Sequence, residues 1–462
     1  MLLSGVSVLV RISVFGFRIL DRLFYRIYRA FSGTRYWCRR RFTRTGLTLL
    51  GALVIAAIMA PDTENNVSYQ VFTLLFCMLA VAAAFGWRFA APFSAKRLLP
   101  RFGTAGCPMT YAVSVKNLSL KNQTGLTLME DWEDPRPSFS EWHAAQRAER
   151  KKLRSFRFSS SQRFNFRLPT IKPGAIPTLT AQEEVEVKIE MTPLRRGILH
   201  FKGVRLARPD PLGLFNAFAR LPLPQSTLIL PRRYPLPPIA FPGTLKYQDG
   251  GVALASHVGQ SEEFIALRDY RHGDPLRHIH WRSWAKAGKP VVKEFEDEFF
   301  VRHALVLDTF IEHPYSELFE EAVSIAASFA CAIQTQESLL DLLFVGPQSY
   351  CFTAGRGLAH TDQMLEILAS VRPCADQSFN SLETLVLNHI SAVSGCICVL
   401  LDWDEKRRRF IEKLRSLGAP ALVLVLVERE RISLDPGPMK DQPDRFHVLH
   451  LGKIKEGLEK LK

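Results

Sequence analysis

The sequence predicts a multidomain membrane protein with two transmembrane helices, an antiparallel β-sandwich and a C-terminal α/β domain. Two uncharged apolar runs lie near the N-terminus, short alternating strands follow them, and the last third of the chain alternates apolar strands with helical segments. We expect five divisions: a basic amphipathic segment over 1–41, a transmembrane hairpin over 42–97, the β-sandwich over 98–235, a charged and aromatic segment over 236–300, and the α/β domain over 301–462.

The two apolar runs have lengths that suit a membrane. The first holds 17 uncharged residues between Arg44 and Asp62, and the second holds 23 between Glu64 and Arg88. A spanning helix needs about 17–25 such residues, so we expect both runs to cross a bilayer. Two buried core helices are the weaker alternative.

The charges around these runs predict their orientation. The loop between them contains two acids and no basic residue, whereas both outer flanks are basic. The flanking cations are Arg39, Arg40, Arg41 and Arg44 on one side and Arg88, Lys96, Arg97 and Arg101 on the other. The positive-inside rule then places both termini and the soluble domains of this multi-pass protein in the cytoplasm.

The positive charge is concentrated near the N-terminus. The chain carries a net charge of +15, and residues 1–101 hold 14 Lys and Arg against only Asp21, Asp62 and Glu64. The rest of the chain is nearly neutral, so we expect no nucleic-acid partner. The eight cysteines include no CxxC pair, a pattern that suits a reducing compartment. Cys396 and Cys398 lie on one face of an apolar strand, where buried core thiols are favoured over a soft-metal site, so we expect no metal and no cofactor.

Arginines recur with helical spacing along the first thirty residues. They are Arg11, Arg18, Arg22, Arg26 and Arg29. At about 100° per residue they fall on one arc of a helix, opposite a row of apolar side chains. This pattern predicts a basic amphipathic helix on an anionic membrane surface; packing against the soluble domain is the alternative.

Two acids stand at strand ends in the α/β domain. Its strands are rich in Leu and Val and alternate with helices, which predicts a mainly parallel sheet. Ligands bind at the carboxyl ends of strands in such sheets, and Asp308 and Asp402 each close an apolar strand. They form the candidate ligand pair, although ordinary strand-end capping explains the same placement and is the favoured interpretation.

The stretch LRDYRHGDPLRHIHWRSWAKAGKPVVKEFEDE, Leu267–Glu298, interleaves arginines, histidines, tryptophans and acids. Asp274 followed by Pro275 predicts a helix N-cap, and Gly288 predicts the end of that helix. The spacing of its histidines does not match a metalloprotease motif, and AGKP lacks the other residues of a phosphate-binding loop. We therefore expect no catalytic residues in this stretch.

Two interpretations of the stretch stay open. On the expected helix, Arg277, Trp281 and Trp284 share one face and Arg282 lies on a cationic face, a composition typical of interface hot spots. The stretch is then a docking surface. Alternatively, a buried ion-pair network joins the two soluble domains through Arg268, Asp269, Asp274, Arg277 and Glu294.

Two stretches of the chain resemble the domain of unknown function 58 family. The pattern of the first falls on Tyr270, Gly273, Asp274, Arg277, Ile279, Trp281, Lys293 and Glu294. The second is RRGILHFKGVRLARPDPLGLF, Arg195–Phe215, which ends in the Asp-Pro-x-Gly-Leu-Phe step of the family's sandwich domain. Two membrane helices ahead of these modules are usual in the family.

The resemblance implies a C-terminal domain similar to a von Willebrand factor type A domain, and an association with MoxR-type AAA+ ATPases. It implies a non-enzymatic adaptor or assembly factor of the bacterial inner membrane, which acts with such an ATPase in the maturation of an unspecified client protein. Phe310 and Glu312 replace the serines of a metal-ion-dependent adhesion site, so we do not expect metal-dependent adhesion. The alternative function is a metal-dependent hydrolase that uses Asp308 and Asp402.

Overall fold

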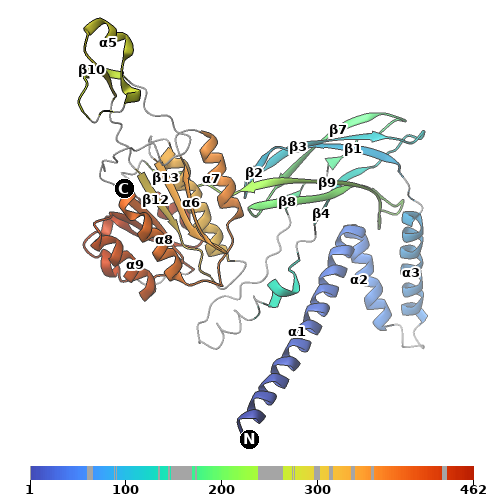
Figure 1. The fold of residues 1–462 in the computed structure, drawn as a ribbon. Coiled ribbons are helices and arrows are strands. Elements are labelled where there is room, and N and C mark those ends of the chain that lie inside the picture. The colour runs from blue at the N-terminus through green and yellow to red at the C-terminus, as the bar shows by residue number, and fades with distance from the viewer. Residues whose placement is uncertain are drawn as a thin grey trace. The chain divides into compact units, whose positions relative to one another are not determined.

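The structure is a computed structural model of the 462-residue chain. It describes residues 2–461 except 60–65, 88, 90, 134–135, 144–145, 147–168, 172–173, 238–263, 273, 275, 296–301, 312–315, 335–338, 355–357 and 429–433. The chain divides into two compact units, Met1–Arg232 and Arg233–Lys462. Figure 1 shows the elements of both units.

The first unit begins with three helices, α1 (Leu2–Arg41), α2 (Arg44–Met59) and α3 (Asn66–Trp87) (Figure 1). Within the described part of the chain, α3 holds the one segment that is long and apolar enough to cross a membrane, Val67–Gly86. α2 is also apolar, but its 16 residues make it shorter. α3 therefore agrees with the second predicted run, and membrane crossing by α2 stays a prediction.

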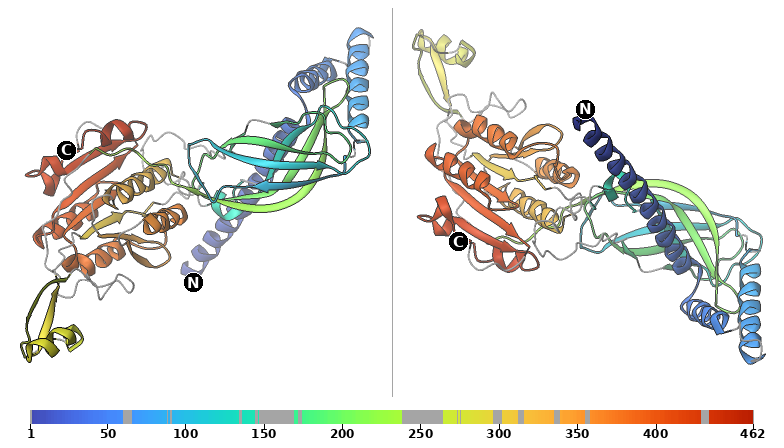
Figure 2. Two further views of the ribbon diagram at one scale, coloured as in Figure 1. Left: turned by 90° about the horizontal axis from the view of Figure 1, so that it is seen from above. Right: turned by 90° about the horizontal axis from the view of Figure 1, so that it is seen from below.

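Two β-sheets follow the helices and form two layers (Figures 1 and 2). One has the order β1-β3-β7-β5 and is antiparallel; the other has the order β2-β9-β8-β4-β6, with a short parallel β2–β9 pair. The strands are β1 (Phe93–Leu98), β2 (Phe102–Thr104), β3 (Met109–Asn117), β4 (Thr127–Trp132), β5 (Thr170–Ile171), β6 (Gly174–Ala175), β7 (Glu184–Thr192), β8 (Gly197–Pro209) and β9 (Asn216–Leu230).

Side chains from both sheets fill one core between the layers. β3 alternates buried and part-exposed positions along its whole length, as a strand does when one face is covered. Val113 of β3, Met191 of β7 and Val204 of β8 have no exposed surface, and residues of both sheets belong to one hydrophobic cluster. This is the arrangement of a β-sandwich.

The second unit is built on a six-stranded sheet of order β14-β13-β12-β15-β16-β17. All neighbouring strands are parallel except β14, which pairs antiparallel with β13 at one edge. The strands are β12 (Arg302–Leu307), β13 (Leu339–Val345), β14 (Ser349–Ala354), β15 (Gly395–Leu400), β16 (Ala421–Val427) and β17 (Phe446–His450). The α-helices around them are α6 (Glu317–Gln334), α7 (Leu358–Ser370), α8 (Phe379–His389), α9 (Glu405–Ser416) and α10 (Ile454–Leu458), and short 3-10 turns are η2 (Ile390–Ala392), η3 (Gly437–Met439) and η4 (Pro443–Arg445).

Helices cover this sheet on both faces (Figures 1 and 2). α8 and α9 bring Phe379 and Phe410 into one cluster with Val306 of β12, while α6 packs on β12, β13, β15 and β16. β15 and β16 are apolar runs because parallel strands covered on both faces have no solvent side. The prediction of an α/β domain with a mainly parallel sheet agrees with this architecture.

Candidate functional site

The stretch that the sequence singles out forms a hairpin (Figure 1). β10 (Phe264–Asp269) pairs antiparallel with β11 (Val291–Phe295). Between the two strands lie the 3-10 turn η1 (Leu276–His278) and the helix α5 (Trp281–Ala287). We call residues 264–295 the signature hairpin.

Asp274 does not cap a helix, which corrects the prediction from the sequence. Its carboxylate accepts two hydrogen bonds from Arg268, at 2.7 and 2.8 Å, and one from the Arg271 amide at 2.8 Å. The Arg268 guanidinium, followed by the Arg271 amide, lowers the pKa of Asp274 to about 2. The side chain therefore fastens the turn at the start of the hairpin as a charged group.

The helix begins seven residues after Asp274, at Trp281. Ile279 is buried and forms a β-bridge with Val292, and the His280 amide donates to the carbonyl of Val291. These contacts with β11 hold the chain away from helical geometry, so η1 and α5 remain separate. The predicted end is confirmed: Gly288 has a φ of 67° and donates its amide to the Trp284 carbonyl.

α5 presents two tryptophans together, as predicted. The rings of Trp281 and Trp284 stack with centroids 5.2 Å apart and an angle of 17° between planes. Trp281 is 65% exposed and Trp284 is half-buried. Arg282 and Lys286 are also exposed on this seven-residue helix. The tip of the signature hairpin is therefore an aromatic surface with cationic neighbours.

The other predicted residues of the hairpin are dispersed. Asp269 pairs with Lys289 at 2.7 Å on the surface, while the half-buried Tyr270 donates its amide to the Pro290 carbonyl. Lys293 lies half-buried on β11. Gly273 and the side chains of Arg277 and Glu294 lie outside the described residues. Of the predicted ion-pair network, the structure thus brings together Arg268 and Asp274.

Asp308 is enclosed at the carboxyl end of β12. It is fully buried, and its carboxylate accepts from the amides of Phe310 and Leu401, each at 3.0 Å. The Arg407 guanidinium on α9 donates to the same carboxylate at 2.6 Å. These three donors join the ends of β12 and β15 to α9, which is a capping role.

Arg407 is held in place from several sides. It bonds Asp404 at 2.9 Å, and its Cζ lies 5.0 Å from the centre of the Phe379 ring. Burial opposes its charge, but the carboxylates of Asp308, Asp404 and Asp402 together outweigh burial, so the pKa of Arg407 is raised. This role could not be predicted, because Arg407 lies in the run EKRRRF, where a solvated helix face is the ordinary expectation.

Asp402 has different surroundings from Asp308. It is exposed, and its carboxylate accepts from the amide of Trp403 at 2.8 Å. Among the described residues, no group of three or more His, Cys, Asp or Glu side chains is placed to hold a metal ion. The strand-end pair thus consists of one buried carboxylate paired with arginine and one solvated carboxylate.

A second element, which the sequence marked only by resemblance, is the turn 210–215; we call it the Asp210 turn. The carboxylate of Asp210 accepts from the amides of Leu212, Leu214 and Phe215 at 2.9, 2.7 and 2.5 Å. Gly213 has a φ of 67°, which favours glycine. The Asp-Pro-x-Gly spacing therefore supplies both the acceptor and the flexible residue of this turn.

The Asp210 turn joins the sandwich to the helices α2 and α3. The Thr43 amide donates to the Leu214 carbonyl at 3.1 Å, and a Cβ on Gly46 would lie 2.0 Å from the same oxygen. Glycine at 46 thus permits α2 to approach the turn. On the other side, Ala82 of α3 is fully buried in a cluster with Leu214 and Phe215.

Arg97 is a buried residue and not one of the cations that flank the second apolar run, which corrects the prediction. The sequence places it among the cations that flank the second apolar run, but in β1 its side chain has 0% exposure and pairs with Glu130, also at 0%. Arg97 further donates to Gly203, Leu223 and Gln225. Arg88, Lys96 and Arg101 remain as flanking cations, so the charge asymmetry persists.

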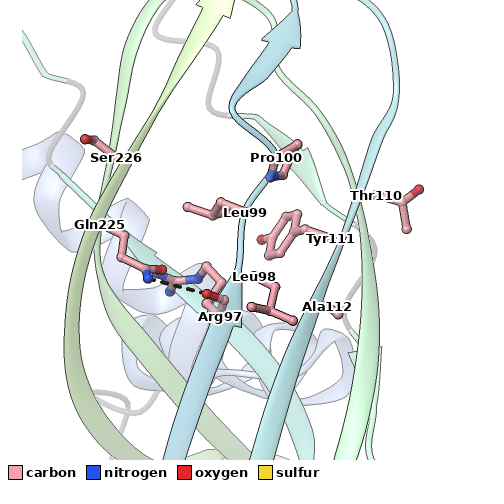
Figure 3. Close-up of a pocket in the computed structure, with 9 residues that line it drawn as sticks. All are labelled: Arg97, Leu98, Leu99, Pro100, Thr110, Tyr111, Ala112, Gln225 and Ser226. Atoms are coloured by element: carbon pink, nitrogen blue, oxygen red, sulfur yellow. Dashed lines mark hydrogen bonds between the residues drawn. The ribbon is translucent and has the colours of Figure 1, made fainter.

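Arg97 lies at an open groove of about 680 Å³ in the sandwich (Figure 3). The groove is lined by Arg97, Leu98, Leu99, Pro100, Thr110, Tyr111, Ala112, Gln225 and Ser226. Tyr111 donates to Glu130 at 3.0 Å, and burial, with Glu130 close by, raises the pKa of Tyr111. Burial also raises the pKa of Glu130 against the opposing effect of Arg97. With every N–H of Arg97 bonded inside the protein, the groove offers no free charge.

Comparison with known proteins covers the signature hairpin and most of the α/β domain. Residues 266–437 match the family model described as "Protein of unknown function DUF58". The chain is similar to the uncharacterized protein YeaD of Bacillus subtilis (strain 168), with 27% identity over 192 residues. This match covers 41% of the chain and 46% of YeaD, so it spans less than half of that relative.

Two solved structures show weak similarity. A PapD-like domain of human CEP192 has 10% identity and a TM-score of 0.17, covering 31% of this chain and 91% of that one. A GH20 exo beta-N-acetylglucosaminidase from Vibrio harveyi has 10% identity and a TM-score of 0.15, covering 73% and 57%.

The family assignment rests on the hairpin and the strands that follow it. The matched segment begins within β10 and ends after β16. It includes the stacked tryptophans, the Arg268–Asp274 pair and the buried Asp308–Arg407 pair. The predicted resemblance to the DUF58 family is thus confirmed over residues 266–437, whereas its second stretch, Arg195–Phe215, lies outside the residues that the family model matches.

Proposed function

We propose that this chain is a membrane-anchored, non-enzymatic adaptor or assembly factor that acts with a MoxR-type AAA+ ATPase in the maturation of other proteins. The observation that carries the proposal is the stacked pair Trp281 and Trp284 at the tip of the signature hairpin. An exposed tryptophan keeps a large apolar area in water, and burying that area against a partner is favourable. Tryptophan and arginine are also the residues most enriched among interface hot spots.

The hairpin is built to hold this surface in a fixed shape. The bidentate Arg268–Asp274 ion pair holds the start of the segment between β10 and β11. At the other end of this segment, Gly288 ends α5 next to β11. A surface that is ordered before binding loses less conformational entropy on association. The exposed cations Arg282 and Lys286 favour a partner whose surface near the aromatic contact is acidic.

The membrane part of the proposal is an anchor formed by α2 and α3 in the bacterial inner membrane. α3 supports it by its length and composition. The positive-inside rule gives cytoplasmic termini and soluble domains. A cysteine introduced at Thr63 should react with an impermeant reagent added outside, and one at the exposed Lys188 should react only after lysis. The reverse labelling would contradict this orientation.

The α/β domain is proposed to be a von Willebrand factor type A-like module without metal-dependent adhesion. The parallel sheet with helices on both faces supports the similarity. At the position of the first serine, Phe310 packs its ring on Phe379 at 5.7 Å. The three donors on Asp308 also argue against the alternative of a hydrolase built on Asp308 and Asp402.

The test is binding of full-length protein in detergent to the MoxR-type ATPase of the same organism. Trp281→Ala and Arg282→Ala should each weaken binding by about 30-fold or more, the equivalent of about 2 kcal/mol for a hot spot. The controls are Arg409→Ala, at an exposed arginine on α9, and Leu417→Ala, at the exposed leucine that follows α9; neither residue belongs to the signature hairpin, and both variants should bind normally. Full binding by both hairpin variants, with unchanged melting temperatures, would refute the docking surface.

A further inference from the structure

Two arginines face each other on neighbouring strands of the sandwich. Arg205 of β8 is the cross-strand partner of Arg220 of β9. Like charges in directly opposite positions destabilise a strand pair. Arg220 is exposed, and it forms no ion pair with a described residue. Arg205 has a carboxylate partner in Asp131, whereas the charge of Arg220 is not neutralised by any described residue.

The end of α1 adds two more arginines at the same place. The Cζ atoms of Arg41 and Arg205 lie 5.0 and 5.9 Å from the centre of one ring, that of Phe218. Arg40 and Arg205 both pair with Asp131. Of the four guanidinium groups gathered here, two thus share one carboxylate. We call Arg40, Arg41, Arg205 and Arg220 the arginine cluster.

Two further observations show that the arginine cluster is not satisfied internally. The Nε atom of Arg205 is buried and has no hydrogen-bond partner among the described residues, an unfavourable state that an added acceptor would relieve. Burial, followed by repulsion from Arg220 and Arg205, lowers the pKa of Arg41. Both effects point to an anion with several oxygen acceptors.

The cluster lies next to the base of the apolar helices. Arg41 also stacks on Phe215 at 5.4 Å, and Phe215 belongs to the Asp210 turn, on which α2 and α3 pack. Phe42 forms a β-bridge with Phe215 just before α2 begins at Arg44. If α2 and α3 enter a bilayer here, the cluster lies at the level of the headgroup phosphates, where each Lys or Arg contributes about 1 kcal/mol of attraction to an anionic surface.

We propose that the arginine cluster binds the phosphate of an anionic phospholipid headgroup. This inference rests on the membrane anchor of the proposed function. A lipid is favoured over a free anion because the cluster adjoins the apolar helices, so that one molecule places its phosphate among the arginines and its chains along α2 and α3. Arginine suits this role because its planar group bonds phosphate through two N–H donors.

The test uses full-length protein in a neutral detergent, with phosphatidylglycerol or phosphatidylcholine added as mixed micelles. The melting temperature should rise with phosphatidylglycerol and much less with phosphatidylcholine. Arg220→Gln should bind phosphatidylglycerol about fivefold more weakly, the equivalent of about 1 kcal/mol, and Arg41→Gln with Arg220→Gln should lose the preference. Without anionic lipid, Arg220→Gln should melt no lower than wild type, because it removes repulsion and no partner. Lys188→Gln, which removes one exposed cation from the other sheet, should behave as wild type.

Two outcomes would overturn the proposal. One is an unchanged response to phosphatidylglycerol in both arginine variants. The other is an equal rise in melting temperature from sodium phosphate at the same phosphate concentration, which would indicate a free-anion site. Alkaline carbonate extraction of wild-type membranes tests the anchor separately. Release of the protein refutes the anchor, whereas retention with an unchanged lipid response in the variants refutes only the headgroup site.

Discussion

The sandwich and the signature hairpin each contain an arginine paired with a carboxylate, in opposite surroundings. Arg97 and Glu130 in the sandwich have 0% exposure, whereas Arg268 and Asp274 in the hairpin keep 33% and 15%. Inside the sandwich, water does not reach either charge, so removing one partner leaves the other buried and unpaired. In the hairpin, water screens the pair and replaces a lost partner. The same chemical pair is thus a structural necessity in one region and a local fastening in the other.

The difference separates the functions of the two regions. The buried Arg97 is fully bonded within the protein and leaves no charge for a ligand, although a groove lies beside it. The hairpin pair holds a turn whose neighbours, including Trp281 and Arg282, stay in solvent. Burial therefore marks the residues that maintain the fold, and exposure marks the surface that is available to a partner.

The largest effect is expected in the sandwich. Arg97→Met should lower the free energy of unfolding by about 3–5 kcal/mol, because Glu130 is left buried without its cation. Adding Glu130→Leu should recover part of the loss, as seen in the melting temperature of the full-length protein. Equal melting temperatures for the single and double variants would show that the pair is not coupled.

The loss in Arg97→Met should also depend on pH. Burial already raises the pKa of Glu130 in the folded protein, and removing Arg97 should raise it further. When a carboxyl has a higher pKa in the folded than in the unfolded protein, the protein loses stability as the pH rises above the unfolded pKa of about 4.3. The variant should therefore be less destabilised at about pH 5 than at about pH 8.

A somewhat smaller effect is expected at the second buried pair. Arg407→Met should destabilise the protein by about 3 kcal/mol, at the low end for a broken buried pair, because Asp308 keeps its two amide donors. Arg409→Met is the matched control on the same helix, where the pair with Glu405 is exposed, and should change stability by less than about 0.5 kcal/mol. Similar melting temperatures for both variants would remove the structural role of Arg407.

We expect the Arg268–Asp274 pair to change the pKa of Asp274 more clearly than it changes the free energy of unfolding. The carboxyl of Asp274 should titrate with a pKa of about 2, which NMR of its carboxyl carbon measures. Arg268→Gln should bring this pKa toward about 3.9. Since the folded pKa is depressed, the contribution of this pair is present above the unfolded pKa and is lost as the pH falls through about 2. An unchanged titration in Arg268→Gln would show that Arg268 does not set it.

The smallest effect is expected for the most exposed pair. Lys289 and Asp269 are 61% and 65% exposed, so Lys289→Ala should change the free energy of unfolding by less than about 0.5 kcal/mol. Chemical unfolding of the full-length protein measures this change. A loss of stability as large as that of Arg407→Met would contradict the expectation that buried ion pairs contribute more to stability than exposed ones.

Much of the α/β domain could be predicted because its signals are local. The run from Glu317 to Gln334 has helical spacing throughout and is observed as α6. The apolar runs of β12, β13, β15 and β16 lie where strands are expected, since such strands need hydrophobic side chains on both faces. The aromatic surface of α5 was also visible, because Trp281 and Trp284 are three residues apart.

The parts that could not be predicted depend on distant residues. Arg97 looks like any cation next to a membrane run, and its partner Glu130 lies 33 residues away on another sheet. Asp274 has the local pattern of an N-cap, but a bridge between Ile279 and Val292 sets the start of the helix instead. The repulsion between Arg205 and Arg220 exists only in the observed register of β8 and β9.

The Asp210 turn has a mechanical consequence. It forms the tip of the β8–β9 hairpin, whose strands are 13 and 15 residues long and run through the sandwich. α2 and α3 are fastened at this tip by Thr43 and Ala82. A change in the tilt of these helices would therefore pull or twist two long strands along their axes. Many hydrogen bonds between the two strands would resist such a force together, so the strand pair would move with the helices as a rigid element.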